Sequence, residues 1–134
     1  GMVPLIRLAS RNSVLASEFL SDDILAQIAT DTKLGGAKLT GMLGTSAWYA
    51  PGAAVSALVQ SIVCDQKKMF PCSAMLEGEF GLNDLTIGVP VILGSNGIEK
   101  IIEIDLDPHE KSLLMESAQG VQSTNTLLKN LNLF

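Results

Sequence analysis

The sequence predicts an α+β fold in which an antiparallel sheet packs against long helices. Two observations carry this prediction. The periodic patterns come in the order helix, helix, three strands, helix, and the three strands are consecutive and joined by short turns. The length of 134 residues is typical of one domain. Because strands do not alternate with helices, the order excludes a doubly wound nucleotide-binding sheet.

The first quarter of the chain predicts an extended entry followed by a helix. Residues 3–10 form an apolar run, and residues 11–20 show no period and are expected to be loop. Ser21 is a candidate N-cap, after which apolar residues recur at helical spacing. Gly35 and Gly36 interrupt that pattern, so either two helices meet there or one long helix is pressed closely against a neighbour.

A second helix is predicted over residues 49–65, because Pro51 is tolerated only in a first turn. Its predicted core face is the stripe Val55, Leu58, Val59 and Ile62.

The period then changes to two residues, which predicts strands. The first covers 68–76, "EGEFG" at 77–81 is a turn, and the second strand covers 85–93. The "GSNG" stretch at 94–97 is a hairpin signal, with Gly and Asn where positive φ is needed, and a third strand is expected over 98–104.

The last helix has the clearest start signal. Asp107 is the predicted N-cap, Pro108 is the first helical residue, and Glu110 completes a capping box. The predicted apolar stripe comprises Leu114, Ala118, Val121 and Leu128.

Composition excludes several function classes. The net charge is −5 with no basic cluster beyond Lys67-Lys68, so a nucleic-acid surface is not expected. No apolar run is long enough for a transmembrane helix, and no signal peptide is visible, so we expect a cytoplasmic protein. Cys64 and Cys72 are expected to be reduced thiols. An apolar content of 47% is high for a small chain, which favours packing against another domain or subunit over a merely well-filled core.

Side chains suited to catalysis are scarce, and we predict no catalytic residue and no metal site. The single histidine, His109, falls in the first turn of the last helix and is expected at the surface. Glu77 and Glu79 could be an acid/base pair, but turn carboxylates are most often simply solvated. Arg7 and Arg11 lie in no evident pocket context.

One stretch, "MLGTSAWYAPG" at residues 42–52, concentrates hydroxyls, the only Trp and Tyr, and a proline. Helix N-termini present free N–H groups that suit polar ligands, and Ala47 keeps the loop slim. The alternative is that Ser46 caps the following helix while Trp48 and Tyr49 anchor it to the core.

The segments "MVPLIR", "GTSAWYAPGAAV" and "LEGEFGLNDLTIGVPVILGSNGIEKIIE" resemble the C-terminal domain of the lactate/malate dehydrogenase family. The resemblance spans roughly Val3 to Leu128, is to the malate dehydrogenases of that family, and predicts that this domain covers 3–134. It implies that Ser46 and Ala47 approach the substrate and that Pro51 lies near NAD, while Trp48 and Tyr49 remain structural. It also implies that the Rossmann domain, the catalytic histidine segment and the substrate-clamping arginines lie outside this chain.

Two hypotheses follow. The first is the substrate domain of an NAD-dependent malate dehydrogenase of the tricarboxylic acid cycle, an oxidoreductase acting on a small dicarboxylic acid. Such a domain would be inactive alone and would bind NAD only weakly. The second is a free-standing binding or oligomerisation module with the same fold and no catalysis. Both predict a homo-oligomer, dimer or tetramer.

Overall fold

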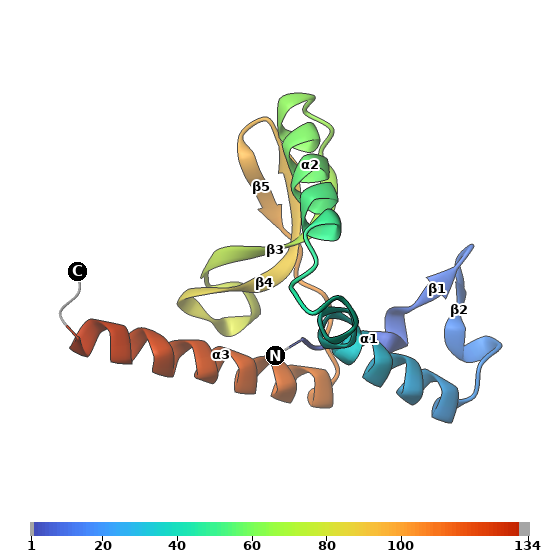
Figure 1. Ribbon diagram of the computed structural model, residues 1–134. Coiled ribbons are helices and arrows are strands. Elements are labelled where there is room, and N and C mark those ends of the chain that lie inside the picture. The colour runs from blue at the N-terminus through green and yellow to red at the C-terminus, as the bar shows by residue number, and fades with distance from the viewer. Residues whose placement is uncertain (1, 132–134) are drawn as a thin grey trace. The chain divides into compact units, whose positions relative to one another are not determined.

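The computed structural model describes residues 2–131 and divides the chain into two compact units, Gly1–Pro51 and Gly52–Phe134. The first unit contains two 3-10 helices, a minimal hairpin and one long helix. The second contains a three-stranded antiparallel sheet, in the order β3-β4-β5, and a long C-terminal helix (Figure 1). The predicted α+β class and antiparallel sheet are confirmed.

The entry to the first unit is more structured than the sequence indicates. A 3-10 helix, η1 (Ile6–Leu8), interrupts the segment expected to be extended. The expected loop holds two antiparallel two-residue strands, β1 (Ser10–Arg11) and β2 (Val14–Leu15), followed by η2 (Ala16–Glu18). Elements this short give no periodic signal, which is why the expectation of loop was wrong.

Helix α1 (Asp22–Leu43) is one continuous helix through both central glycines. The alternative of two helices meeting at Gly35 and Gly36 is therefore wrong. No other atom lies within 4 Å of a Cβ built on either glycine, so the close neighbour of the remaining alternative is not within the described chain. Each glycine destabilises the helix by about 1 kcal/mol relative to alanine. Ser21 stands at the N-cap but makes no capping side-chain hydrogen bond.

Helix α1 buries little of its apolar surface. Only Leu25 is buried, although the sequence spacing suggested a face of several apolar residues. The exposed members of that pattern are Ile24, Ile28, Leu39, Met42 and Leu43.

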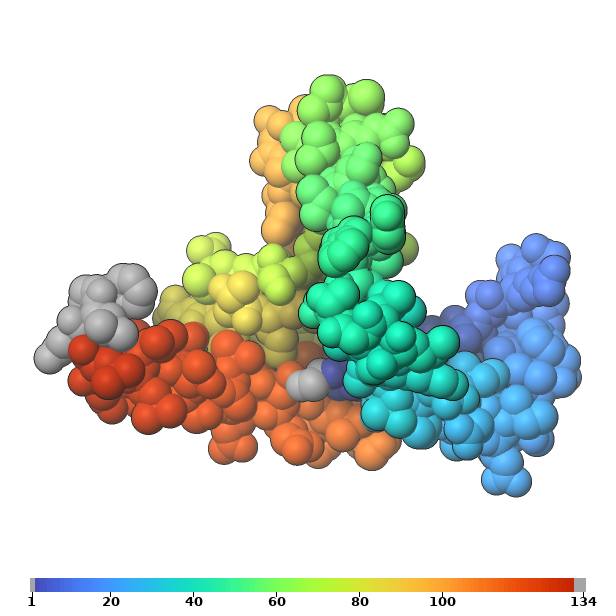
Figure 2. All heavy atoms as spheres, viewed as in Figure 1, coloured from blue at the N-terminus to red at the C-terminus, as the bar shows by residue number. Residues whose placement is uncertain are grey.

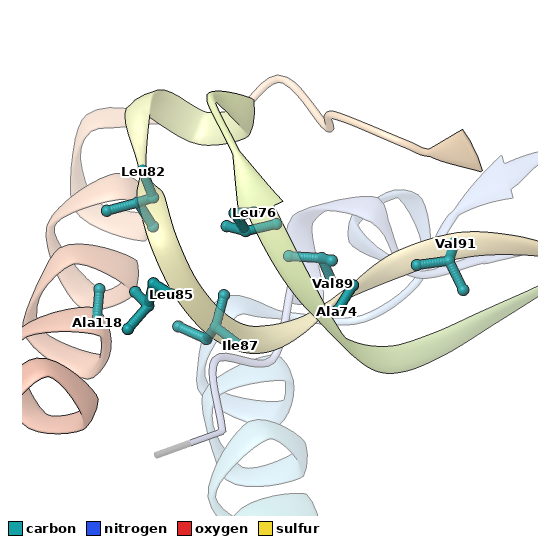
Figure 3. Close-up of a cluster of buried hydrophobic side chains, with 8 residues drawn as sticks. All are labelled: Ala74, Leu76, Leu82, Leu85, Ile87, Val89, Val91 and Ala118. Atoms are coloured by element: carbon teal, nitrogen blue, oxygen red, sulfur yellow. The ribbon is translucent and has the colours of Figure 1, made fainter. Parts of the chain in front are cut away.

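The core of the second unit lies between the sheet and α3 (Pro108–Asn130). Strand β3 (Lys68–Glu77) pairs with β4 (Asn83–Gly94), and β4 pairs with β5 (Gly97–Ile101). The buried cluster consists of alternating side chains from the two long strands, Leu82 from the turn between them and one alanine from the helix: Ala74, Leu76, Leu82, Leu85, Ile87, Val89, Val91 and Ala118 (Figure 3). The predicted two-residue period therefore identifies the core face correctly.

Two prolines lie directly opposite each other in the β3–β4 ladder. Pro71 pairs with Pro90, and neither has an N–H to donate. This is tolerated because the two form a non-hydrogen-bonded pair. The Pro90 carbonyl points away from β3 and accepts a hydrogen bond of 2.8 Å from the N–H of Ile102. Pro71 thus removes a donor only from the outer edge of the sheet, where it discourages pairing with another strand.

Both turns lie at the predicted positions, 77–81 and 94–97, but their backbone conformations add details that the sequence did not predict. The 77–81 turn contains η3 (Glu79–Gly81), with Phe80 at φ 54°. In the β4–β5 hairpin the positive φ falls on Gly97, at 84°, and Asn96 is not among the positive-φ residues. Strand β5 ends at Ile101, three residues earlier than predicted.

The capping box of α3 is confirmed. The Glu110 N–H donates to Asp107 Oδ1 at 2.8 Å, and the Asp107 N–H donates to Glu110 Oε2 at 3.0 Å. The apolar stripe of this helix holds as far as Val121, but Leu128 is 40% exposed because it lies past the residues that pack against the sheet cluster.

Helix α2 (Tyr49–Val63) begins where predicted, with Pro51 in its first turn. The predicted core face is wrong at two of its four positions: Val55 and Val59 are 57% and 51% exposed, whereas Leu58 and Ile62 are half-buried. Ser61 is the only buried residue of the helix. The helix is held by a polar contact, since Ser61 Oγ donates to the Leu93 carbonyl at 2.7 Å. None of the helices in the described part of the chain combines the length and apolar character needed to cross a membrane.

Replacing Ser61 with alanine should destabilise the fold by about 1–3 kcal/mol, because the buried Leu93 carbonyl loses its side-chain donor. Ser56→Ala, on the exposed side of the same helix, is the matched control and should change the free energy of unfolding by less than about 0.5 kcal/mol. Urea denaturation followed by circular dichroism measures both. Equal effects of the two substitutions would contradict the anchoring role of Ser61.

Candidate functional site

The loop between α1 and α2 is the candidate site. Helix α1 ends at Leu43, and Gly44 adopts the left-handed conformation (φ 68°) that commonly ends a helix. Residues 45–48 then form no helix or strand before α2 begins at Tyr49. The loop is therefore short and held at both ends by helices.

The predicted ligand-contacting residues lie close together in the sequence of this loop. Ser46 is exposed, Ala47 is partly buried, and Pro51 is exposed in the first turn of α2. In the part of the chain that the structure describes, the Ser46 side chain makes no hydrogen bond. It also precedes the first helical residue by three positions, so it is not the residue that caps α2. The hydroxyl is thus left for another partner.

The two aromatic side chains of the loop do not anchor it to a core. Trp48 is 64% exposed and Tyr49 is 84% exposed, with ring centroids 6.1 Å apart and tilted by 49°. The structural role expected for them is therefore wrong within this chain. Large aromatic side chains left in solvent are typical of a surface that contacts another protein or a ligand.

The first turn of α2 carries no acidic residue, and the whole helix from Tyr49 to Val63 has no charged side chain. The free N–H groups and partial positive charge of its N-terminus therefore face no local carboxylate. That environment suits an anionic or polar ligand group. The side chains of α2 include no carboxylate, histidine or lysine to transfer a proton and no arginine to bind a substrate carboxylate.

At its other end, α2 is tied to the sheet by an electrostatic cluster that the sequence did not reveal. Asp65 Oδ1 accepts a hydrogen bond of 2.9 Å from the Ser95 N–H at the tip of the β4–β5 hairpin. Lys67 Nζ lies 3.5 Å from Glu99 Oε2 and 3.9 Å from Asp65 Oδ2. A Cβ on Gly94 would come within 2.8 Å of Asp65 Oδ1 and closer still to the Glu99 carboxylate, so a larger residue there would displace both carboxylates of the cluster.

The remaining titratable candidates have local structural roles. Glu79 Oε2 accepts a hydrogen bond of 2.7 Å from the Glu77 N–H, and this bond lowers the pKa of the Glu79 carboxyl. A general acid or base working near neutral pH needs a raised carboxyl pKa, so the pair fits a solvated turn better than catalysis. His109 is exposed at the second residue of α3, as predicted.

A second concave region has fewer side chains suited to binding or catalysis. A hollow of about 440 Å³ runs beside α3 and is lined by Leu82, Ser112, Met115, Glu116, Ala118, Gln119 and Gln122. Its only charged group is one carboxylate, and it contains no nucleophile–base pair. Within residues 2–131 no three histidine, cysteine or carboxylate side chains gather in a way that could hold a metal ion. The loop remains the better candidate.

The chain is similar to known proteins along nearly its whole length. Residues 3–132 match the model of the lactate/malate dehydrogenase alpha/beta C-terminal domain. This chain belongs to that family. Its relatives include malate dehydrogenases from Flavobacterium johnsoniae (56% identical over 130 residues, 97% of this chain and 42% of the relative) and Bacteroides thetaiotaomicron (55% identical over 128 residues, 96% and 41%). The chain thus spans less than half the length of these curated relatives.

Solved structures of the same family agree on the fold. Malate dehydrogenase from Salinibacter ruber superposes with a TM-score of 0.93 at 42% identity, over 97% of this chain and 43% of that one. Lactate dehydrogenase from Eimeria maxima, solved with NADH and oxamate, gives 0.92 at 34% identity, over 96% and 42%. The dehydrogenase C-terminal domain predicted from sequence is therefore confirmed.

The Asp65 cluster makes a pH prediction. The Ser95 N–H, the largest cause, holds the pKa of Asp65 below its usual value, and Lys67 adds to the effect. A lowered folded-state pKa gives stability that is fully present above the unfolded pKa of about 3.9 and is lost as pH falls through the folded value. Asp65→Asn should therefore reduce the loss of stability below about pH 4. Glu116→Gln is the surface control, and denaturation at a series of pH values measures both.

Direct titration provides a second check on the same prediction. The carboxyl carbon resonance of Asp65, followed by NMR, should shift at a lower pH than in an unfolded peptide of the same sequence. Titration at the ordinary value would contradict the hydrogen bond to Ser95.

Proposed function

We propose that this chain is the substrate domain of an NAD-dependent malate dehydrogenase. The observation that carries the proposal is the unpartnered Ser46–Ala47 loop, in a chain 56% identical to the matching part of a malate dehydrogenase. In this role Ser46 and Ala47 form part of the wall that meets the dicarboxylic acid. Pro51, in the exposed first turn of α2, forms part of the wall beside NAD.

The residues present fit one side of such a site. The uncharged α2 N-terminus and the small Ala47 side chain leave room for a polar ligand beside the backbone. Bound NAD would supply the hydride acceptor, so that malate and NAD⁺ give oxaloacetate, NADH and a proton. The loop itself, residues 45–48, carries no carboxylate or histidine that could serve as the base, and Glu79 is engaged in its own turn.

We infer from this division that catalysis is completed by protein outside the 134 residues. A hydride transfer requires the base, the substrate clamp and the cofactor to be held together in reactive geometry. The exposed Trp48 and Tyr49, together with Val55, Val59 and Val63 on the uncharged α2, supply apolar surface for such a partner domain. The same surplus of exposed apolar side chains leads us to propose that the chain self-associates, as a dimer or larger species. A cytoplasmic location is part of this proposal.

The purified chain should not reduce NAD in the presence of malate. A chimera in which these residues replace the C-terminal part of the Flavobacterium johnsoniae malate dehydrogenase should do so, because the relative supplies the missing groups. Absorbance at the NADH wavelength follows both reactions, with lactate as the substrate control. A folded chimera without malate oxidation, or one that prefers lactate, would refute the proposal and favour a non-catalytic binding module.

Within the active chimera, Ala47→Trp should lower kcat/KM for malate by at least about tenfold, because the bulky side chain fills the space beside the loop backbone. Ser56→Ala is the control on an exposed position of α2 outside the loop. Unchanged kinetics for Ala47→Trp, with normal folding by circular dichroism, would remove Ala47 from the substrate wall while leaving the family assignment intact.

A further inference from the structure

Helix α2 makes its polar contacts with the sheet near its C-terminal end. Ser61 Oγ donates a hydrogen bond of 2.7 Å to the Leu93 carbonyl of β4. Asp65, two residues past the helix, accepts one of 2.9 Å from the Ser95 N–H at the tip of the β4–β5 hairpin. In the described part of the chain, Ser61 is the only residue of α2 whose side chain makes a hydrogen bond or an ion pair. Figure 1 shows this end of α2 beside the hairpin.

The N-terminal half of α2 is exposed. Every residue from 49 to 56 is exposed, and the first half-buried residue is Ala57. Figure 2 shows side chains of α2, coloured green, at the surface along the helix. Within the described residues, packing and polar contacts therefore hold one end of α2, and the opposite end is the one that follows the Ser46–Ala47 loop.

The connection from α2 to β3 is strained rather than flexible. Asp65 and Lys67 have φ angles of 45° and 51°, in the left-handed region that favours glycine. Such conformations in other residues persist only where surrounding contacts hold them. The contacts here are those of Asp65 with the Ser95 N–H and of Lys67 Nζ with Glu99 Oε2, at 3.5 Å. The side chains of the two strained residues thus join the end of α2 to the hairpin at two points.

A small change at this contact becomes a larger one at the far end of the helix. Ser61 and Tyr49 are twelve residues apart, which corresponds to about 18 Å of helix. A rotation of about 5° about Ser61 would therefore move Tyr49 by about 1.5 Å. The Ser46–Ala47 loop joins the helix at this end. In an active site, a misplacement of about 1 Å can lower the rate about a hundredfold.

We propose that Asp65 is a positioning residue for the substrate loop and that it acts through α2. Its hydrogen bond to the Ser95 N–H fixes the direction of the helix against the hairpin. The helix then transmits this direction to Ser46 and Ala47, while Asp65 itself makes no contact with the substrate. The inference rests on the proposed function of the loop, but the hold of Asp65 on α2 can be measured without malate.

The only tryptophan reports on the far end of the helix, because Trp48 directly precedes α2. In the intact chain, Asp65→Ala should increase the amplitude of the nanosecond depolarisation of Trp48 at least about twofold, because α2 gains freedom to move. Asp65 is exposed, so the substitution should leave the fold intact. Asp107→Ala is the matched control, since it removes an equivalent bond of 2.8 Å from the Glu110 N–H and should leave Trp48 unchanged. Time-resolved fluorescence anisotropy measures both variants, and circular dichroism checks their folding.

The chimera with the Flavobacterium johnsoniae malate dehydrogenase tests the consequence for the reaction. Asp65→Ala should lower kcat/KM for malate at least about tenfold, because the substrate loop is displaced. Asp65→Asn should stay within about threefold of the unchanged chimera, since its amide oxygen can still accept the Ser95 N–H. Gly94→Ala should reproduce the loss, because its methyl group would displace the Asp65 and Glu99 carboxylates. Asp107→Ala should leave kcat/KM unchanged although it lowers the melting temperature.

The outcomes separate positioning from stability and from the proposed function. Unchanged Trp48 motion in a folded Asp65→Ala variant would overturn the proposal, as would increased motion with unchanged kcat/KM. An equal effect of Asp107→Ala would also overturn it, because general destabilisation would then be the cause. Failure of the chimera to oxidise malate would overturn the proposed function of the loop, and the Trp48 measurement would still decide whether Asp65 holds α2.

Discussion

The strict alternation of side chains along the β3–β4 hairpin is the constraint on which the second unit depends. It directs alternate residues of each strand to one face, where they enclose a cluster with Ala118 of α3. A shift of one residue would turn every one of these side chains to the other face. The opposed prolines, Pro71 and Pro90, are compatible only with a register that makes them a non-hydrogen-bonded pair. Register, core and edge protection are therefore set by the same few positions.

The first unit has no comparable core. Ala16 and Leu25 are its only buried hydrophobic residues among those described, and α1 keeps its length although glycines stand at three of its positions. A helix with so little tertiary burial is stabilised weakly by its own propensity. A partner that covered its exposed apolar residues would therefore add to the stability of α1. The same reasoning applies to α2, whose attachment through Ser61 and Asp65 is polar while its valines remain in solvent.

Sequence patterns predicted the features that depend on residues close together in the chain. They missed the features that depend on which surfaces the fold covers. The α3 capping box, the hairpin at Gly94–Gly97 and the core parity of β4 all follow from residues close in sequence. The core face assigned to α2 was wrong at Val55 and Val59, because an apolar stripe has the same pattern in the sequence whether or not the fold covers it. No sequence pattern identified Ser61 as buried, because a buried serine and an exposed serine look alike in an apolar helix. Its acceptor, the Leu93 carbonyl, lies 32 residues away and is brought near only by the fold.

The same distinction governs the candidate site. The loop of Ser46 and Ala47 was found because hydroxyls, aromatics and a proline concentrate there, and family resemblance gave those residues their proposed roles. In the fold, the Ser46 hydroxyl makes no hydrogen bond and Trp48 is exposed, which is typical of a surface that binds a ligand or another protein. Neither a base nor a clamp stands on this loop, so the proposed substrate wall would have to receive its catalytic groups from elsewhere. Those groups would have to bring charge and a proton acceptor, because α2 offers only its backbone dipole.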